Sequence, residues 1–401
     1  MAQQSNVANA SGPIYGGANN GALTGAGTVD ERRALYLKLF SGEMFKGFQH
    51  NTIARDLVTR RTLKNGRSLQ FIYTGRTKSE FHIPGQSILG NDEKSPPVAE
   101  KTIECDDLLI SSAFVYELDE TLAHYDLRGE ISRKIGYALA ENYDRRIFRA
   151  ITKAARQASP VSMTNFKEPG GSVLKVGDDD STSKADAYNS DKLVTAFYDA
   201  AAILDEKGVS GEGRVAVLNP RQYYTLIQNV NGNGLINRDV QGSALQSGNG
   251  IIEIAGIKIF KSMNIPFLGK FGTDAGTNTR AKYASNDNAG DFVGATMDDQ
   301  ETAATPAGGQ KTVNNYGTAA KFANSCGLIF QKEAAGVVEA IGPQVQVTSG
   351  DVSVVYQGDV ILGRLAMGAD FLNPAAAVEL VAGVDVSSNF NDTAVSNASF
   401  T

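Results

Sequence analysis

Histidine, cysteine and tryptophan are scarce in this sequence, and their scarcity narrows the chemistry that the chain can perform. Its 401 residues include three histidines, two cysteines and no tryptophan. His50, His82 and His124 form no HxH or HxxxH pair, so the usual histidine spacing of a zinc site is absent. Cys105 and Cys326 form no CxxC motif and are expected to be free thiols in a reducing cytosol. We therefore predict no metal and no other cofactor.

The motifs of common enzyme classes are also missing. Ser87 in GQSILG lacks the second glycine of the GxSxG nucleophile elbow. The GGQKT segment at Gly308 lacks the first glycine of a phosphate-binding loop. The acidic cluster at residues 178–180 does not follow the spacing of a calcium-binding loop, and a solvated loop explains it better. The sequence thus gives an enzyme no positive support.

Long apolar runs and a strong net charge are absent as well. No segment approaches the stretch of about 18–20 apolar residues that a membrane-spanning helix needs, and the first residues do not resemble a signal peptide. Lysine and arginine number 38 against 44 aspartates and glutamates, which gives a net charge of −6. An acidic chain is not expected to coat nucleic acid, because phosphates attract basic surfaces. We predict a chain that is made in a cytosol and has no membrane partner.

The sequence does contain one very long amphipathic pattern, from Asp126 to Ala158. An average helix of a globular protein is about a third as long. Asp126 is placed to cap the N-terminus, and Ser159-Pro160 follows as a stop signal. We predict a single spine helix over residues 126–158. Its apolar stripe, repeating every four residues, comprises Leu127, Ile131, Ile135, Leu139, Tyr143, Ile147, Ile151 and Ala155.

A long β-hairpin is predicted ahead of this helix. Residues 68–73 and 100–105 alternate between apolar and polar side chains, as strands do. The segment between them carries Gly/Pro turn signals and apolar side chains that include Phe81 and Ile83. A hairpin alone is only marginally stable in water, so this one is expected to need a partner surface.

Charge is distributed unevenly around the hairpin. Residues 31–80 hold eleven lysines and arginines against four acidic residues, whereas residues 91–120 hold two against nine. Solvated faces or pairing across one hairpin would explain this pattern, and so would contact between the basic part of one subunit and the acidic part of a neighbour. The candidate intersubunit residues are Arg60, Arg61, Lys64, Arg67, Arg76, Lys78, Phe81, Ile83, Asp92, Glu93, Glu104, Asp106 and Asp107.

Shorter elements are predicted after the spine helix. Ser190 is expected to cap a helix that ends at Lys207-Gly208, and a buried strand at 214–218 leads into a helix begun by Asn219-Pro220. A tight hairpin follows at 251–260. Further on, the pattern predicts a strand at 327–330 and an Ala-rich helix in KEAAGVVEA, residues 332–340. Residues 269–320, rich in Gly, Asn and Thr, are expected to form an exposed insertion.

Several of these segments together resemble one protein family. They are ALYLKLFSGEMFKGF near the start, TGRTKSEFHIPGQ in the hairpin, LDETLAHYDLRGEI before the spine, GRVAVLNPRQYYTLI after it and LGRLAMGADFLNPAAAVEL near the end. In order and spacing they are similar to the major capsid protein of T-seven-like podoviruses, tailed bacteriophages, and a cyanophage member of that family fits as well. The resemblance covers roughly residues 30–265 and 325–380.

The resemblance implies an α+β fold of the Hong Kong 97 type. On that basis we expect an N-terminal arm over residues 1–50, an extended loop over 51–105 and a peripheral domain over 106–184. An axial domain would follow over 185–324 and would include the insertion at 269–320. Residues 325–382 would return to the peripheral domain, and 383–401 would be a flexible tail.

The resemblance also implies a function in self-assembly. The expected protein is a major capsid protein that builds an icosahedral shell around the double-stranded DNA of a tailed phage, through a procapsid that matures. Implied partners are other copies in hexamers and pentamers with a triangulation number of seven, a scaffolding protein and a portal at one vertex. The DNA would be enclosed without sequence-specific binding, in a virion assembled in the cytoplasm of a bacterial host. Two alternatives stay open, an encapsulin-type cellular compartment shell and a soluble enzyme with an unrecognised site.

Overall fold

The chain divides into two compact units. The computed structural model describes residues 52–75, 79, 81–85, 87, 98–105, 108–116, 127–158, 162–163, 166–167, 169–177, 184–227, 252–262, 264–265, 325–347 and 357–382. The first unit comprises Met1–Thr52, Cys105–Tyr143 and Glu339–Met367. The second comprises Ile53–Glu104, Asp144–Val338 and Gly368–Thr401. The predicted arm, the insertion at 269–320, the tail at 383–401 and the acidic cluster at 178–180 lie outside the described residues.

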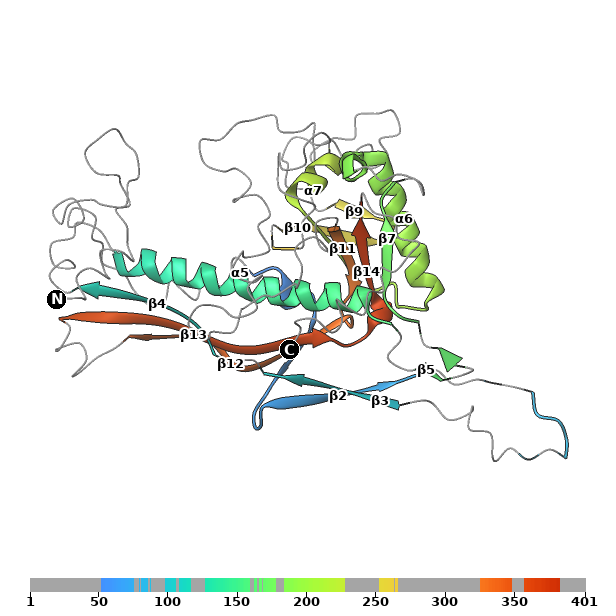
Figure 1. Ribbon diagram of the computed structural model, residues 1–401, viewed down its shortest axis with the longest axis horizontal. Helices are drawn as coiled ribbons and strands as arrows, with labels where there is room; N and C mark the ends of the chain where they lie inside the picture. Colours follow the sequence, from blue (N-terminus) through green and yellow to red (C-terminus); the bar gives the residue numbers. More distant parts are fainter. Residues whose placement is uncertain are drawn as a thin grey trace. The chain divides into compact units, whose positions relative to one another are not determined.

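The first unit contains strands β4, Leu109–Tyr116, and most of β13, Gly358–Phe371. These two strands pair antiparallel, from Gly358 opposite Tyr116 to Leu365 opposite Leu109. Strand β12, Ala335–Val347, lies on the other side of β13, in a four-stranded sheet ordered β1-β12-β13-β4 (Figure 1). Strand β1 is Thr59–Thr62. The Tyr143 hydroxyl donates a 2.6 Å hydrogen bond to Glu339 and so fixes the spine helix to β12.

The predicted spine helix is confirmed as α5, Leu127–Arg156, which spans 30 residues. Leu139, Tyr143, Ile147 and Ile151 on its apolar stripe are at most 1% exposed. Asp126, the expected N-cap, lies outside the described residues. At the other end, Arg156 donates two hydrogen bonds, of 2.5 and 2.6 Å, to the carboxylate of buried Glu379. The helix is long because packing covers one side of it almost from end to end, and packing, more than intrinsic propensity, stabilises helices in proteins.

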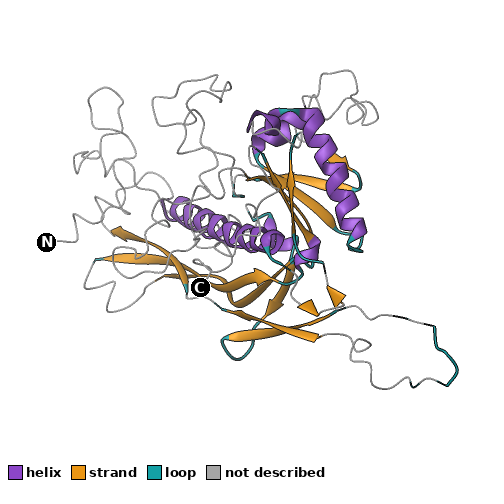
Figure 2. Cartoon of the chain, turned by 45° about the vertical axis from the view of Figure 1, so that its right-hand side comes forward, coloured by secondary structure: helices purple, strands orange, loops and turns teal. Residues whose placement is uncertain are grey.

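The second unit is built on a six-stranded sheet ordered β7-β14-β11-β8-β10-β9. Parallel pairs join β14 to β7 and β8 to β10, and the remaining neighbours are antiparallel. Helices α6 and α7 pack against this sheet through a core that includes Phe197, Leu204 and Leu226 (Figure 2). The strands are β7, Ser172–Lys175; β8, Arg214–Leu218; β9, Ile252–Ile254; β10, Ile257–Lys261; β11, Ser325–Gln331; and β14, Ala377–Val381.

The helices of the second unit begin and end close to the predicted residues. Helix α6 is Ser190–Glu206, and its N-cap is Asn189, not Ser190 as predicted, since the Asn189 side chain accepts a 3.0 Å hydrogen bond from the Asp191 amide. Helix α7 is Pro220–Ile227, with the expected proline in its first position. Short elements complete the unit: 3₁₀ turns η1, Ala54–Asp56, η3, Lys184–Tyr188, and η5, Pro374–Ala376, and the strand pair β5, Ser162–Met163, and β6, Phe166–Lys167.

The prediction of an Ala-rich helix at residues 332–340 is wrong. This segment turns at 332–334 and continues as β12. Val337 and Val338 point to opposite faces of the strand and both are 0% exposed, so the segment is apolar on every side because it is buried on both faces. Position 336 requires glycine because a Cβ there would lie 2.7 Å from the Leu372 side chain.

The stretch 325–382 contributes strands to both units. Strand β11 pairs with β8, and β14 pairs with both β11 and β7, so both strands belong to the sheet of the second unit. Only part of the stretch, in β12 and β13, contributes to the first unit. The pairing follows from the fully buried runs in β8, β11 and β14, which are apolar enough to occupy central positions of a sheet.

The continuity of α5 can be tested by Ala140→Pro. Ala140 is fully buried in the helix, and proline would remove one backbone hydrogen bond and clash with the preceding turn. We expect the free energy of unfolding, measured by urea titration of the isolated chain, to fall by about 3 kcal/mol or more. The control Lys134→Ala, at an exposed position of the same helix, should change it by less than about 0.5 kcal/mol. Equal stability of the two variants would contradict a continuous packed helix.

Candidate intersubunit surface

The predicted hairpin is confirmed as strands β2, Ser68–Thr74, and β3, Val98–Glu104, which pair antiparallel from Ser68 opposite Glu104 to Thr74 opposite Val98. Side chains alternate between its two faces, as the sequence pattern predicts. Phe71 and Ile103 point inward and are 9% and 1% exposed. The hairpin therefore packs one face on its own unit.

The other face of the hairpin is exposed and carries large apolar side chains. Ile72 and Val98 are 76% and 64% exposed. Beyond the strands, the candidate residues Phe81 and Ile83 are 101% and 58% exposed. Glu100 and the candidate Glu104 share the outer face. Exposed apolar groups gathered in one segment mark an interaction surface more often than a solvated one.

The inner face of the hairpin is attached through a shared carboxylate. The Lys101 ammonium lies 2.7 Å from one oxygen of Asp370, and the Lys153 ammonium lies 3.2 Å from the other. Both lysines also face the Phe371 ring, at 3.9 and 5.2 Å from its centroid. Burial lowers the pKa of Lys153, and the charge of Asp370 opposes that shift. The contact joins the hairpin to the end of α5 and to the end of β13.

A buried carboxylate holds the start of the hairpin segment. The amides of Ile53 and Ala54, at the beginning of η1, donate hydrogen bonds of 3.0 and 3.2 Å to the two oxygens of Asp144 on α5. Asp144 is 0% exposed. Burial raises its pKa to about 7, and the two backbone hydrogen bonds oppose this shift without cancelling it.

The basic candidates are brought together only in part. Arg60 and Arg61 lie on β1, and Lys64 and Arg67 lie between β1 and β2, all four exposed. The Arg61 guanidinium lies 4.8 Å from the centroid of the Phe71 ring. In the part of the chain that the structure describes, no ion pair joins Arg61, Lys64 or Arg67 to Glu100 or Glu104. The remaining charged candidates, outside the described residues, are Arg76, Lys78, Asp92, Glu93, Asp106 and Asp107.

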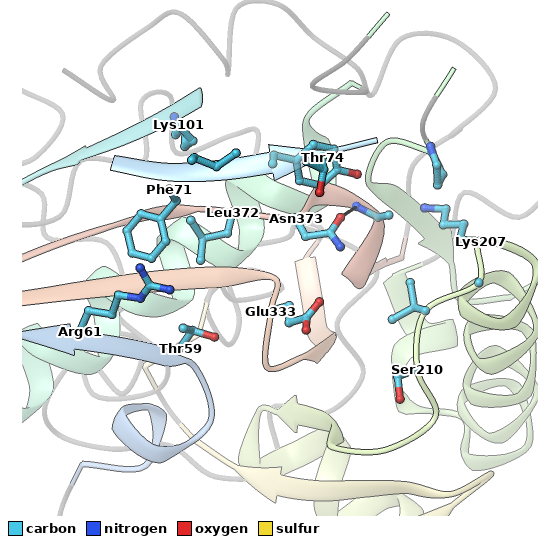
Figure 3. A pocket seen from close by; sticks show the side chains of 16 residues that line it. Thr59, Arg61, Phe71, Thr74, Lys101, Lys207, Ser210, Glu333, Leu372 and Asn373 are labelled. Carbon is cyan, nitrogen blue, oxygen red and sulfur yellow. Dashed lines mark hydrogen bonds between the residues drawn. The ribbon is translucent and has the colours of Figure 1, made fainter. Parts of the chain in front are cut away.

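A groove of about 550 Å³ beside Arg61 was not predicted from the sequence (Figure 3). Its walls come from β1, the hairpin, the turn after α6, the turn at Glu333 and the segment Leu372–Ala375. On one wall, the Lys207 ammonium donates 2.6 Å hydrogen bonds to the Gly170 carbonyl and the Ser172 hydroxyl. Burial lowers the pKa of Lys207 to about 8. Segments so distant in sequence meet only in the folded chain, so no local pattern could have indicated the groove.

Cys105 and Cys326 are both buried. Burial, helped by the charge of Glu379, raises the pKa of the Cys326 thiol. Within the ranges that the structure describes, no group of three or more His, Cys, Asp or Glu side chains is placed to hold a metal ion. Within the same ranges, no helix combines the length and apolar character needed to cross a membrane.

Sequence comparison decides the family. A family model described as Gp10A-like major capsid protein matches residues 70–381. The chain belongs to this family. The capsid protein is 24% identical over 377 residues to the major capsid protein of Escherichia phage T7, a match that covers 93% of this chain and 99% of that protein. It is 33% identical over 128 residues to the major capsid protein of Enterobacteria phage T3, covering 32% of this chain and 37% of that one.

Solved structures give the same result. The capsid of the cyanophage P-SCSP1u is 30% identical and has a TM-score of 0.62, over 90% of this chain and 95% of that chain. The mature capsid of bacteriophage PhiM1 has a TM-score of 0.55 at 13% identity, over 83% of this chain and 87% of that chain, and shows the fold alone. The capsid protein therefore has the mixed helix-and-strand fold of the Hong Kong 97 type. It is a structural, non-enzymatic major capsid protein of a tailed phage, and neither the family nor these relatives support a cellular compartment shell or an enzyme.

The buried carboxylate of Asp144 predicts a specific pH dependence. Its folded-state pKa of about 7 lies above the ordinary 3.8, so its contribution to stability is fully present below pH 3.8 and is lost as the pH rises through 7. Asp144→Asn cannot titrate and should lack this component. Between pH 5 and 8, the free energy of unfolding of the unchanged chain should fall relative to Asp144→Asn, by on the order of 3 kcal/mol at most.

Urea titrations of the isolated chain at several pH values measure this difference. The matched control is Asp199→Asn, which removes an exposed carboxylate of α6 and should run parallel to the unchanged chain at every pH. A constant difference between the unchanged chain and Asp144→Asn would show that Asp144 does not titrate in this range.

Proposed function

We propose that this capsid protein forms an icosahedral shell of hexamers and pentamers, with a triangulation number of seven, around double-stranded DNA. In this proposal a scaffolding protein directs a procapsid with a portal at one vertex, in the cytoplasm of a bacterial host. The exposed apolar side chains of the hairpin and of the segment between its strands carry the proposal, because an isolated chain leaves Ile72, Val98, Phe81 and Ile83 in water. The membership of the chain in a major capsid protein family supports it.

The free energies of apolar burial and of ion pairing indicate which contacts stabilise the assembly. Full burial of a large aliphatic or aromatic side chain contributes about 1.5–3 kcal/mol, whereas an exposed ion pair contributes about 0–1 kcal/mol. The apolar groups of the hairpin therefore supply most of the affinity, and the charged residues select the partner and its register. Each contact is weak by itself, but a closed shell repeats it in every subunit.

The expected domain layout is retained with one change. We propose that the hairpin corresponds to the extended loop of the fold and that the six-stranded sheet with α6 and α7 corresponds to the axial domain. Strands β11 and β14 pair within this sheet and are assigned to the axial domain. The net charge of −6 supports the enclosure of DNA without sequence-specific binding, since an acidic container does not adsorb the polyanion.

Expression with the scaffolding protein of the same phage tests the function directly. We expect closed icosahedral particles in electron micrographs and a sedimentation coefficient far above that of a hexamer. Expression of the scaffolding protein alone is the control. If the purified protein sediments only as monomers or small rings under all conditions with the scaffold present, the shell proposal fails.

A charge exchange tests whether the basic and acidic stretches pair between subunits. Arg60→Glu with Arg61→Glu should block assembly, because like charges would then face each other at every contact. Asp106→Lys with Asp107→Lys, made in a second chain, should restore particles in part when the two mutant chains are mixed. Particle yield by sedimentation is the measurement. Rescue that occurs only when all four changes share one chain would place the pairing within a subunit and remove the intersubunit interpretation.

A further inference from the structure

The groove shown in Figure 3 has the features of a receptor for a carboxylate beside an apolar side chain. Its charged lining consists of three cations, Arg61, Lys101 and Lys207, against one carboxylate, Glu333. Its apolar lining includes Phe71 and Leu372. A volume of about 550 Å³ is enough for a few side chains and too small for a folded element.

Two of the three cations already have partners. Lys101 is paired with Asp370 at 2.7 Å, and Lys207 donates to Gly170 and Ser172. Arg61 differs from both: among the described residues, no acceptor is hydrogen-bonded to its guanidinium. The guanidinium carbon lies 4.8 Å from the centroid of the Phe71 ring. The planar set of N–H donors of an arginine matches a carboxylate in two parallel hydrogen bonds.

The chain itself contains a segment with the matching chemistry. Asp106 and Asp107 directly precede Leu108, which is 44% exposed, and Ile110 is 57% exposed. Residues 106–110 thus combine two carboxylates with apolar side chains that are left in water. They belong to the acidic stretch of residues 91–120, in which nine acidic residues face two lysines. Charge complementarity therefore favours another copy of this chain as the occupant of the groove.

We propose that the groove beside Arg61 receives residues 106–110 of a second copy of this chain. A carboxylate of Asp106 or Asp107 accepts hydrogen bonds from the Arg61 guanidinium, and Leu108 packs against the partly exposed Leu372. This inference rests on the proposed assembly into shells and names the surface at which two subunits recognise each other. It explains why charge of one sign lies before the hairpin and charge of the other sign follows it.

Photo-cross-linking from the groove tests the proposal. Ser210 is exposed and lines the groove, so Ser210→Cys can carry a benzophenone attached through the thiol. The unsubstituted chain, treated with the same reagent, reports any background from Cys105 and Cys326, both of which are buried. A second control, Lys258→Cys, places the label at an exposed position of β10 that does not line the groove. Shells are assembled from an equal mixture of ¹⁴N- and ¹⁵N-labelled chains before irradiation.

The expected product is a cross-link from position 210 to a peptide containing residues 106–110, with half of the pairs of mixed isotopic composition. Only light–light and heavy–heavy pairs would mean that the segment lies in the groove of its own chain, and the proposal would be overturned. A cross-link to a different segment, or to another protein, would overturn it as well while the shells themselves remain. If the unsubstituted chain forms no shells, the proposed function fails before the groove is tested.

A pair of substitutions adds a quantitative check. In Ser210→Cys shells, Arg61→Ala should lower the yield of this cross-link at least fivefold, because the carboxylate loses its donor. Lys258→Ala removes a positive charge of the same unit outside the groove and should leave the yield unchanged. An unchanged yield in Arg61→Ala would overturn the role of the guanidinium. Circular dichroism and thermal melting of the isolated variants confirm that each is folded, and the cross-linking result without Arg61→Ala stands independently of that variant.

Discussion

The second half of α5 is the element on which the second unit depends, because it contacts three separate parts of that unit in succession. At its end, Arg156 forms a bidentate pair with Glu379 on β14, and both side chains are at most 4% exposed. One turn earlier, Lys153 shares Asp370 with Lys101 of the hairpin. Two to three turns earlier still, Asp144 holds the first residues of η1. The helix thus positions the central sheet, the hairpin and the segment before the hairpin in one order along its axis.

The hairpin shows how a capsid subunit can be stably folded and still bind other subunits. Its inner face packs within the chain, where Phe71 and Ile103 are buried and Lys101 forms an ion pair with Asp370. Its outer face leaves Ile72 and Val98 in water. The contacts that stabilise the fold and the side chains available for association therefore lie on opposite faces of the same two strands. This separation follows from the alternation of side chains along a β-strand.

Much of this architecture was predictable from periodicity, and the exceptions have physical reasons. The helix at 126–158 was predictable because its apolar residues recur every four positions, and those from Ile135 to Ala155 are at most 5% exposed. The segment at 332–340 was not, since a strand buried on both faces and an Ala-rich helix can show the same short apolar run, here residues 334–338. The cap of α6 was misplaced by one residue because Asn189 and Ser190 are both good capping residues.

The groove and the charged residues that line it could not be predicted from the sequence, for a different reason. Arg61 was predicted as one of several basic intersubunit candidates, and nothing near it in sequence indicates that its guanidinium lies over Phe71. That contact depends on how β1 and β2 are placed next to each other. Lys207, Glu333 and Leu372 come from three further segments. Local patterns report the periodicity of single elements, whereas this surface exists only where several elements converge.

The carboxylate shared by Lys101 and Lys153 makes the hairpin mechanically compliant. If the hairpin tilts and withdraws Lys101, Asp370 keeps its second lysine, so the carboxylate still has a cationic partner. The free energy needed for that movement is then close to that of breaking a partly exposed ion pair, about 0–1 kcal/mol. Breaking a buried ion pair would need roughly 3–5 kcal/mol. Glu379, in contrast, has no second cation paired with it among the described residues. Separating it from Arg156 would leave a buried charge without a partner, so this contact resists movement more strongly. In the proposed shell, the angle of the hairpin can therefore differ between subunits while the central sheet keeps its geometry.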